Sequence, residues 1–300
     1  MAKNYKHELP YNDGWKKLTG PLPIKLTNDY LFRALLQADE ETLKTIVADL
    51  LYMDVGDVTD IEVTNPIVLG ETVTDKEIHL DLNAIVNGDR NINLEMQVLH
   101  EDNWIDRSML YAFRSFDSLS HGEDYMDAEG VIQISFTDFT LFKDAPEFYS
   151  TFKLINEKNP GQVYSEKIRI SNVNLTRIDL ATEENKEYRV DYWAKLFKAK
   201  SWEEVKMLAE NRPEMEKAAS SIWQISEEDK IKEQIRRRTA NEHLYQRRME
   251  KLRRLEEEVR EKEEEVREKD EELKTVKEML EEKEKRIKEL ETMLHNSTRD

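Results

Sequence analysis

Two acidic side chains and one amide within residues 78–98 have the spacing that metal chemistry needs. Apolar and polar residues alternate on both sides of an Asn87-Gly88-Asp89 turn signal. Alternation with a period of two predicts two strands with one apolar face each, and the turn predicts that they form an antiparallel hairpin. Asp81 in the first strand and Glu95 in the second then fall on the polar face, and Gln97 follows Glu95 on that face.

The register of this hairpin decides whether the two acids meet. Pairing Val86 with Asp89 would set the apolar face of one strand against the polar face of the other, which the pattern forbids. Pairing Val86 with Arg90 keeps the apolar faces together and places Asp81 opposite Glu95. Directly opposed side chains have Cβ atoms about 4.5–5.5 Å apart. Two carboxylates at that separation repel unless a cation joins them, and Mg²⁺ prefers oxygen ligands, so the hairpin predicts half of a metal site.

A second interpretation of the same pattern involves no chemistry. Antiparallel sheets commonly keep one face in solvent, and polar side chains on that face need no function. Periodicity alone leaves both interpretations open.

The motif resembles that of a known family. Asp81, a hairpin turn and then Glu95-Met96-Gln97 are similar to the core of the PD-(D/E)XK nucleases, and more narrowly to their Rpn-type, transposase-associated branch. The resemblance implies a restriction-endonuclease-like core, a metal ion (Mg²⁺ or Mn²⁺) held by Asp81 and Glu95, and DNA as the substrate. Gln97 stands where the broader superfamily has lysine. Its amide can orient a water or a phosphate but adds no positive charge.

The resemblance also implies an arginine and a tyrosine on the next helix, which Arg107 and Tyr111 match. Residues 104–119 are predicted to be helical, and Arg107, Tyr111 and Arg114 fall at i, i+4 and i+7, on one face. In the functional interpretation the arginines bind phosphate, for which their planar donors are suited. The alternative is an arginine that lies over a tyrosine on the helix surface.

Asp29 is the remaining candidate catalytic side chain. Thr27 or Asn28 is expected to cap a helix that runs through Leu36, which puts Asp29 in its first turn. The family supplies an acid to the metal site from this region, and Asp29 is the matching position. An acid in a first turn is also favoured by the helix dipole alone, so this position has two explanations.

Composition limits the possible partners. Residues 246–300 hold 16 basic and 19 acidic side chains, which leaves 30 and 45 for residues 1–245. Such an acidic body argues against tight non-specific DNA binding, which needs a basic footprint. Residues 230–254 are an exception, with ten basic and three acidic side chains. We expect no secretory signal and no membrane span, and the lack of cysteine is compatible with the cytoplasm.

The remaining elements predict an α/β or α+β fold with a mixed central sheet flanked by helices. A helix at 40–52 and a strand at 61–69 precede the hairpin, and a strand at 131–136 is expected to run parallel to the second hairpin strand, because the helix between them supplies the crossover. A second hairpin is predicted over 148–170, and further helices follow residue 188. We expect four segments: an unstructured lead (1–20), a nuclease-like core (21–185), a helical segment (186–245) and a long helix or coiled coil (246–300).

The last segment carries an apolar residue every seven positions from Leu252 to Leu294, the spacing of a coiled-coil seam. The companion position three residues further on is lysine at three of six places, so the seam is weak in its middle. Acid-before-base pairs four residues apart, such as Glu256 and Arg260, support a helix that needs no partner. We therefore expect a long helix that forms at most a weak homodimer through residues 246–300.

Taken together, these features predict a Mg²⁺-dependent DNA endonuclease of the transposase-associated type. Asp81 and Glu95 would hold the metal, Gln97 and Asp29 would assist, and Arg107, Tyr111 and Arg114 would contact the substrate. The alternative is a catalytically weak or inactive protein with the nuclease fold, which assembles through its coiled coil. The acidic body and the long tail both favour that alternative.

Overall fold

The computed structural model describes residues 9–65, 82–117 and 124–297. The chain divides into two compact units, Met1–Glu242 and His243–Asp300, and each is described by itself. The first contains the sheet and the hydrophobic core.

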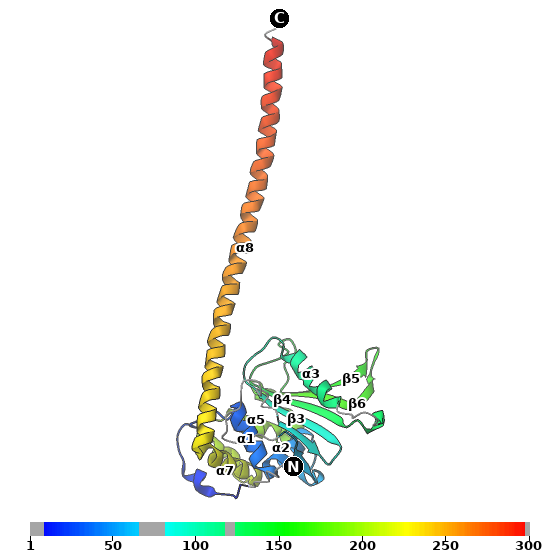
Figure 1. The fold of residues 1–300 in the computed structure, drawn as a ribbon, viewed down its shortest axis with the longest axis vertical. Helices are drawn as coiled ribbons and strands as arrows, with labels where there is room; N and C mark the ends of the chain where they lie inside the picture. The colour runs from blue at the N-terminus through cyan, green and yellow to red at the C-terminus, as the bar shows by residue number, and fades with distance from the viewer. Residues whose placement is uncertain (1–8, 66–81, 118–123, 298–300) are drawn as a thin grey trace. The chain divides into compact units, whose positions relative to one another are not determined.

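A mixed six-stranded sheet forms the centre of the first unit, as predicted (Figure 1). The strand order is β1-β2-β3-β4-β6-β5. The neighbours β3, β4 and β6 are parallel, and the remaining pairs are antiparallel. The strands are β1 (Ile61–Val63), β2 (Leu82–Val86), β3 (Arg90–Gln97), β4 (Gly130–Thr137), β5 (Tyr149–Asn156) and β6 (Asn159–Asn174).

The hairpin of β2 and β3 has the predicted register. Val86 pairs with Arg90, and the pairing continues to Leu82 opposite Leu94. The three-residue loop between them depends on Asn87 and Gly88, which both have positive φ, 52° and 71°. Such left-handed backbone suits glycine and asparagine better than other residues.

Asp81 lies outside the described residues, so its predicted place opposite Glu95 is not described. The strand predicted at 61–69 is shorter than expected, because β1 ends at Val63, and residues 66–69 also lie outside the described ranges. Thr64 still donates its backbone N–H to the carbonyl of Asn83 at 2.8 Å, so pairing with β2 continues one residue past β1.

Helix α3 (Trp104–Phe116) connects the parallel strands β3 and β4, as predicted. It ends three residues before the predicted end at 119. Its Ala112 packs on Val131 of β4 and Ile168 of β6. Because side chains alternate along a strand, this face of the sheet is opposite to the one that carries Leu94 and the main core.

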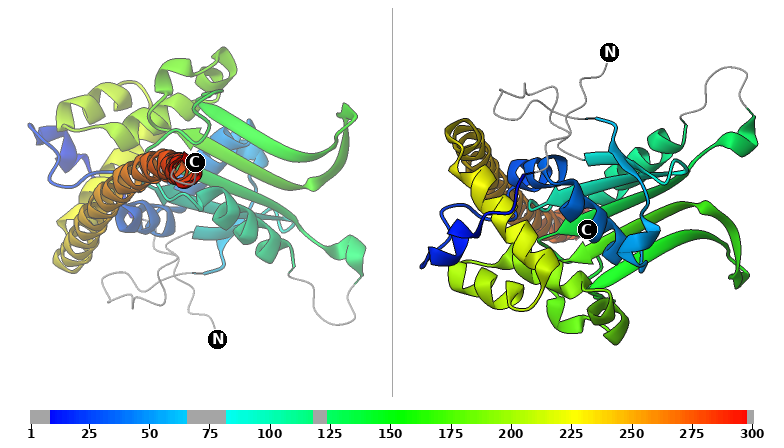
Figure 2. Two further views of the ribbon diagram at one scale, coloured as in Figure 1. Left: turned by 90° about the horizontal axis from the view of Figure 1, so that it is seen from above. Right: turned by 90° about the horizontal axis from the view of Figure 1, so that it is seen from below.

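The other helices of this unit cover the opposite face (Figure 2). An aromatic cluster joins them to the sheet: Phe32 of α1 lies 5.6 Å from Phe136 of β4, and Phe197 of α5 lies within 5.3 Å of both rings, measured between centroids. Asn28 caps α1 by accepting the N–H of Leu31 at 3.1 Å, which confirms the predicted cap. The larger helices of this layer are α1 (Asp29–Ala38), α2 (Glu40–Leu50), α5 (Val190–Lys198), α6 (Trp202–Ala209) and α7 (Pro213–Glu227).

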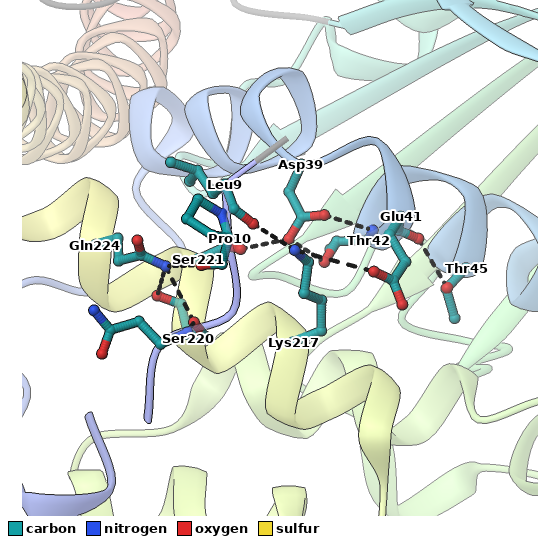
Figure 3. Close-up of polar contacts among 11 residues, drawn as sticks. Leu9, Pro10, Asp39, Glu41, Thr42, Thr45, Lys217, Ser220, Ser221 and Gln224 are labelled. Carbon is teal, nitrogen blue, oxygen red and sulfur yellow. Dashed lines mark hydrogen bonds and ion pairs between the residues drawn. The ribbon is translucent and has the colours of Figure 1, made fainter. Parts of the chain in front are cut away.

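Polar contacts hold the N-terminal segment and α2 against α7 (Figure 3). The buried carboxylate of Asp39 caps α2 by accepting the N–H of Thr42 at 3.0 Å, and it also accepts the hydroxyl of Ser221 on α7. Lys217 donates to the carbonyl of Leu9 at 2.5 Å. Residues 9–20, which belong to the segment predicted as an unstructured lead, therefore pack on the helical layer, with Trp15 buried.

The tail is part of one helix, α8 (Asp229–Ser297), which crosses the boundary between the two units. Its apolar seam is exposed along its described length: Leu252, Val259, Val266, Leu273, Leu280 and Ile287 each expose half or more of their surface. Within the described ranges, no helix combines the length and apolar character needed to cross a membrane.

Candidate functional site

Strand β3 places Glu95 and Gln97 on the face of the sheet that α3 covers. Leu94 and Met96 alternate with them and enter the main core. Glu95 and Gln97 are themselves buried. A buried carboxylate is costly unless a cation or hydrogen-bond donors accompany it, so the surroundings of Glu95 decide what this site can do.

Arg107 of α3 forms an ion pair with this carboxylate. Its Nη2 lies 2.8 Å from Glu95 Oε1, and its Nη1 lies 2.5 Å from Oε2 of Glu101, in the loop before α3. The guanidinium also lies over the rings of Trp104 and Tyr111, at 4.6 and 5.7 Å from their centroids. Burial acts against the charge on Arg107, but Glu95 and Glu101 outweigh it, so the pKa of Arg107 lies above its ordinary value.

Gln97 is oriented by two hydrogen bonds. Its Nε2 donates to the carbonyl of Leu99 at 2.7 Å, which turns its Oε1 toward Nη2 of Arg107 at 3.3 Å. A carboxylate oxygen of Glu95 and the amide oxygen of Gln97 therefore converge on one positively charged nitrogen. Oxygen ligands of this kind are those that Mg²⁺ prefers, so the donor chemistry fits a hard divalent cation.

The described residues supply only part of a metal site. Across the described ranges, no three Asp, Glu or His side chains come close enough to hold a metal ion. Asp81, the second predicted ligand, lies outside those ranges. Of the two predicted metal ligands the structure therefore places Glu95, with Gln97 of the predicted catalytic residues beside it.

The predicted substrate-binding residues divide into two groups. Arg107 lies over the ring of Tyr111, as their helical spacing predicts, and Arg107 also forms an ion pair with Glu95. Arg114 is exposed further along α3 and forms no ion pair with any residue in the described ranges. The sequence did not predict that Arg107 would be held by two carboxylates.

Asp29 has surroundings that the sequence did not reveal. Burial raises the pKa of its carboxyl above the ordinary value, and the charge of Arg238 on α8 acts against that shift. The neighbouring Glu242 has a pKa raised to about 7, first by burial and then by the charge of Asp29. Both α8 residues are more than 200 positions from Asp29 in the sequence, so no local pattern could have identified them.

Sequence reasoning also missed a set of buried polar side chains beneath α3. Neighbouring strands bring them into rows: Asn93 pairs with Gln133, and Glu95 pairs with Ser135, which pairs with Asn172. All are buried. The signal was present, because polar residues alternate with apolar ones in β4 and at the end of β6 just as they do in β3.

We predict that Glu242 makes the metal-free protein less stable as the pH rises. Because its pKa is raised from 4.5 to about 7 on folding, the folded state binds this proton more tightly than the unfolded chain. The resulting stabilisation is complete below pH 4.5 and is lost as the pH rises toward 7. In Glu242→Gln this dependence should weaken, with stability above that of the wild type at about pH 8.

Urea unfolding at a series of pH values measures this effect. Glu233→Gln, which alters an exposed acid on the same helix, is the control and should follow the wild type. Equal pH dependence in the wild type and Glu242→Gln would contradict the assignment.

Comparison with known proteins gives one match. The family model of the PD-(D/E)XK nuclease family transposases matches residues 26–251, well over half of the chain. No curated protein and no solved structure matches it. The matched range contains the whole sheet, α3 and the Glu95–Gln97–Arg107 cluster. The chain therefore belongs to the PD-(D/E)XK nuclease family transposases.

Proposed function

We propose that this protein hydrolyses DNA phosphodiester bonds with the help of Mg²⁺ or Mn²⁺. The observation that carries the proposal is the convergence of Glu95 and Gln97 oxygens on the cation of Arg107. Membership of a nuclease family supports the reaction class. Asp81 and Glu95 would hold the metal, which when bound lowers the pKa of a water and neutralises charge on the scissile phosphate.

Arg107 has a role that its contacts support. Ion pairs with Glu95 and Glu101 hold the guanidinium in place. A phosphate bound at the metal would lie beside it. An arginine offers five donors in a fixed plane, so it can bind a phosphate oxygen without releasing every carboxylate contact. We assign Arg107 to the substrate phosphate, with the ring of Tyr111 supporting its side chain.

The remaining candidates have subordinate roles. Gln97 is positioned to orient a water or a phosphate oxygen through Oε1, because its Nε2 is already bound to Leu99. Arg114 would contact the DNA backbone from the exposed side of α3. Asp29 is assigned as an assisting acid on the family resemblance, and its raised pKa makes a proton-carrying role chemically reasonable.

We predict that Glu95→Gln abolishes metal-dependent plasmid nicking and leaves the fold intact. The substitution removes the negative charge that would hold the metal, while the amide keeps the size of the side chain and can still bond to Arg107. Asp81→Asn should have the same effect. Supercoiled plasmid in Mg²⁺ or Mn²⁺ is the substrate, and circular dichroism checks folding.

Glu62→Gln is the matched control, because Glu62 is an exposed acid on strand β1 of the same sheet. It should nick as the wild type does. Nicking that survives in purified Glu95→Gln would refute the assignment of this residue.

A second candidate function is assembly through the tail, with weak or absent catalysis. The exposed seam of α8 favours it, since large apolar side chains repeat there every seven residues. The ion pairs Arg254–Glu250 and Arg286–Glu289 join residues four and three positions apart, so they support the helix itself. A weak parallel or antiparallel homodimer through residues 246–300 is our proposal for the oligomeric state.

We predict that a fragment spanning 246–300 stays helical on dilution while its mass falls to that of a monomer. The lysines at the companion seam position keep their charge in water, so pairing should be weak, whereas contacts within the helix do not depend on concentration. Circular dichroism and sedimentation over a wide concentration range separate the two properties. If helicity is lost together with the dimer on dilution, the helix forms only in the dimer and the prediction is wrong.

A further inference from the structure

A cavity of about 440 Å³ lies where the loop between β4 and β5 meets the outer strands β5 and β6. Its floor includes Asn172 of β6 and Ser150 and Phe152 of β5. Phe152 and Asn172 lie on the α3 face of the sheet, because Ile170, which pairs with Phe152 and lies two residues before Asn172 in β6, packs under α3. The cavity therefore shares a face of the sheet with Glu95.

A row of polar side chains connects this cavity to Glu95. Glu95 pairs with Ser135, Ser135 with Asn172, and Asn172 with Ser150. Adjacent strands are about 4.7–4.9 Å apart, so Glu95 and Asn172 are separated by about 10 Å across the sheet. That separation is comparable to the span of one nucleotide from its phosphate to the far edge of its base.

Two atoms of this row are buried without a partner. Ser135 is 2 % exposed and Asn172 is 6 % exposed. Neither Oγ of Ser135 nor Oδ1 of Asn172 accepts or donates a hydrogen bond within the described part of the chain. Buried polar atoms are nearly always satisfied in native proteins. Asn172 therefore lines the cavity with a carboxamide whose oxygen has no partner in the described part of the chain.

The walls of the cavity suit a flat, uncharged ligand. Phe142 and Phe152 expose 42 % and 43 % of their surfaces, and their ring centroids are 5.5 Å apart. Lys143 is the one basic side chain of the lining, against the acids Asp144 and Glu147. That balance disfavours a phosphate, whereas aromatic rings stack with any nucleobase.

We propose that this cavity binds an unpaired base of the substrate strand, with adenine preferred. The base stacks on the exposed face of Phe152 or Phe142, and its amino group donates to Oδ1 of Asn172. A carboxamide matches the donor and acceptor edge of adenine in two places, and thymine has no amino group to offer. The inference rests on the proposed function, because it places the base one nucleotide span from a phosphate at Glu95.

Binding of single-stranded oligodeoxyadenylate and oligodeoxythymidylate, measured by fluorescence anisotropy in EDTA, tests this proposal. The full chain is used, and EDTA removes the metal ion that the proposed cleavage requires. We expect the wild type to bind the adenine strand more tightly. Phe152→Ala should weaken that binding about tenfold, the typical loss when a stacked ring is removed. Asn172→Leu should remove the difference between the two strands.

Tyr164→Ala is the matched control, because Tyr164 is 86 % exposed on the same hairpin but does not line the cavity. It should bind both strands as the wild type does. Phe152→Trp, which keeps a stacking surface, should retain binding and shows that any loss in Phe152→Ala is not caused by misfolding.

The outcomes separate this inference from the proposed function. Equal affinity of the wild type for the two strands, or unchanged binding by Phe152→Ala, would overturn the inference even if the wild type nicks plasmid. Base-dependent binding that is lost in Phe152→Ala would support the inference even in a protein that shows no nicking.

Discussion

The ion pair between Arg107 and Glu95 is the interaction on which the rest of the site depends. It joins α3 to β3 across a buried polar face, and Glu101 holds the second arm of the guanidinium. Removing one member of such a buried pair leaves an uncompensated charge, at a cost on the order of 3–5 kcal/mol. The pair therefore fixes where α3 lies and keeps a carboxylate in the protein interior that would otherwise be unstable there.

The Glu95 carboxylate belongs to the rows of buried polar side chains beneath α3. Strands β3, β4 and β6 run parallel, and their alternating side chains carry polar groups from Glu95 toward the outer edge of the sheet. In an ordinary core these positions would be apolar. An acidic body repels DNA at long range, so the DNA binding that we propose would depend on local contacts of this kind.

Sequence patterns predicted the fold better than the site. The register of β2 and β3, the parallel pairing of β4 and the cap on α1 follow from local periodicity, turn residues and capping chemistry, all of which act over a few residues. The cluster of Glu95, Gln97 and Arg107 was predicted in part, because the periodicity of strand and helix indicates which face of each element carries these side chains. The second carboxylate on Arg107, the neighbours of Asp29 on α8 and the cavity at Asn172 depend on tertiary packing between distant segments, for which one sequence carries no signal.

The central claim is that Glu95 is a ligand for a divalent cation, and calorimetric titration of Mn²⁺ into the metal-free protein tests it without reference to catalysis. The account predicts that the wild type binds Mn²⁺ and that Glu95→Gln loses this binding while its circular dichroism spectrum remains that of the folded protein. Identical isotherms for the two proteins, or no binding by the wild type, would contradict it.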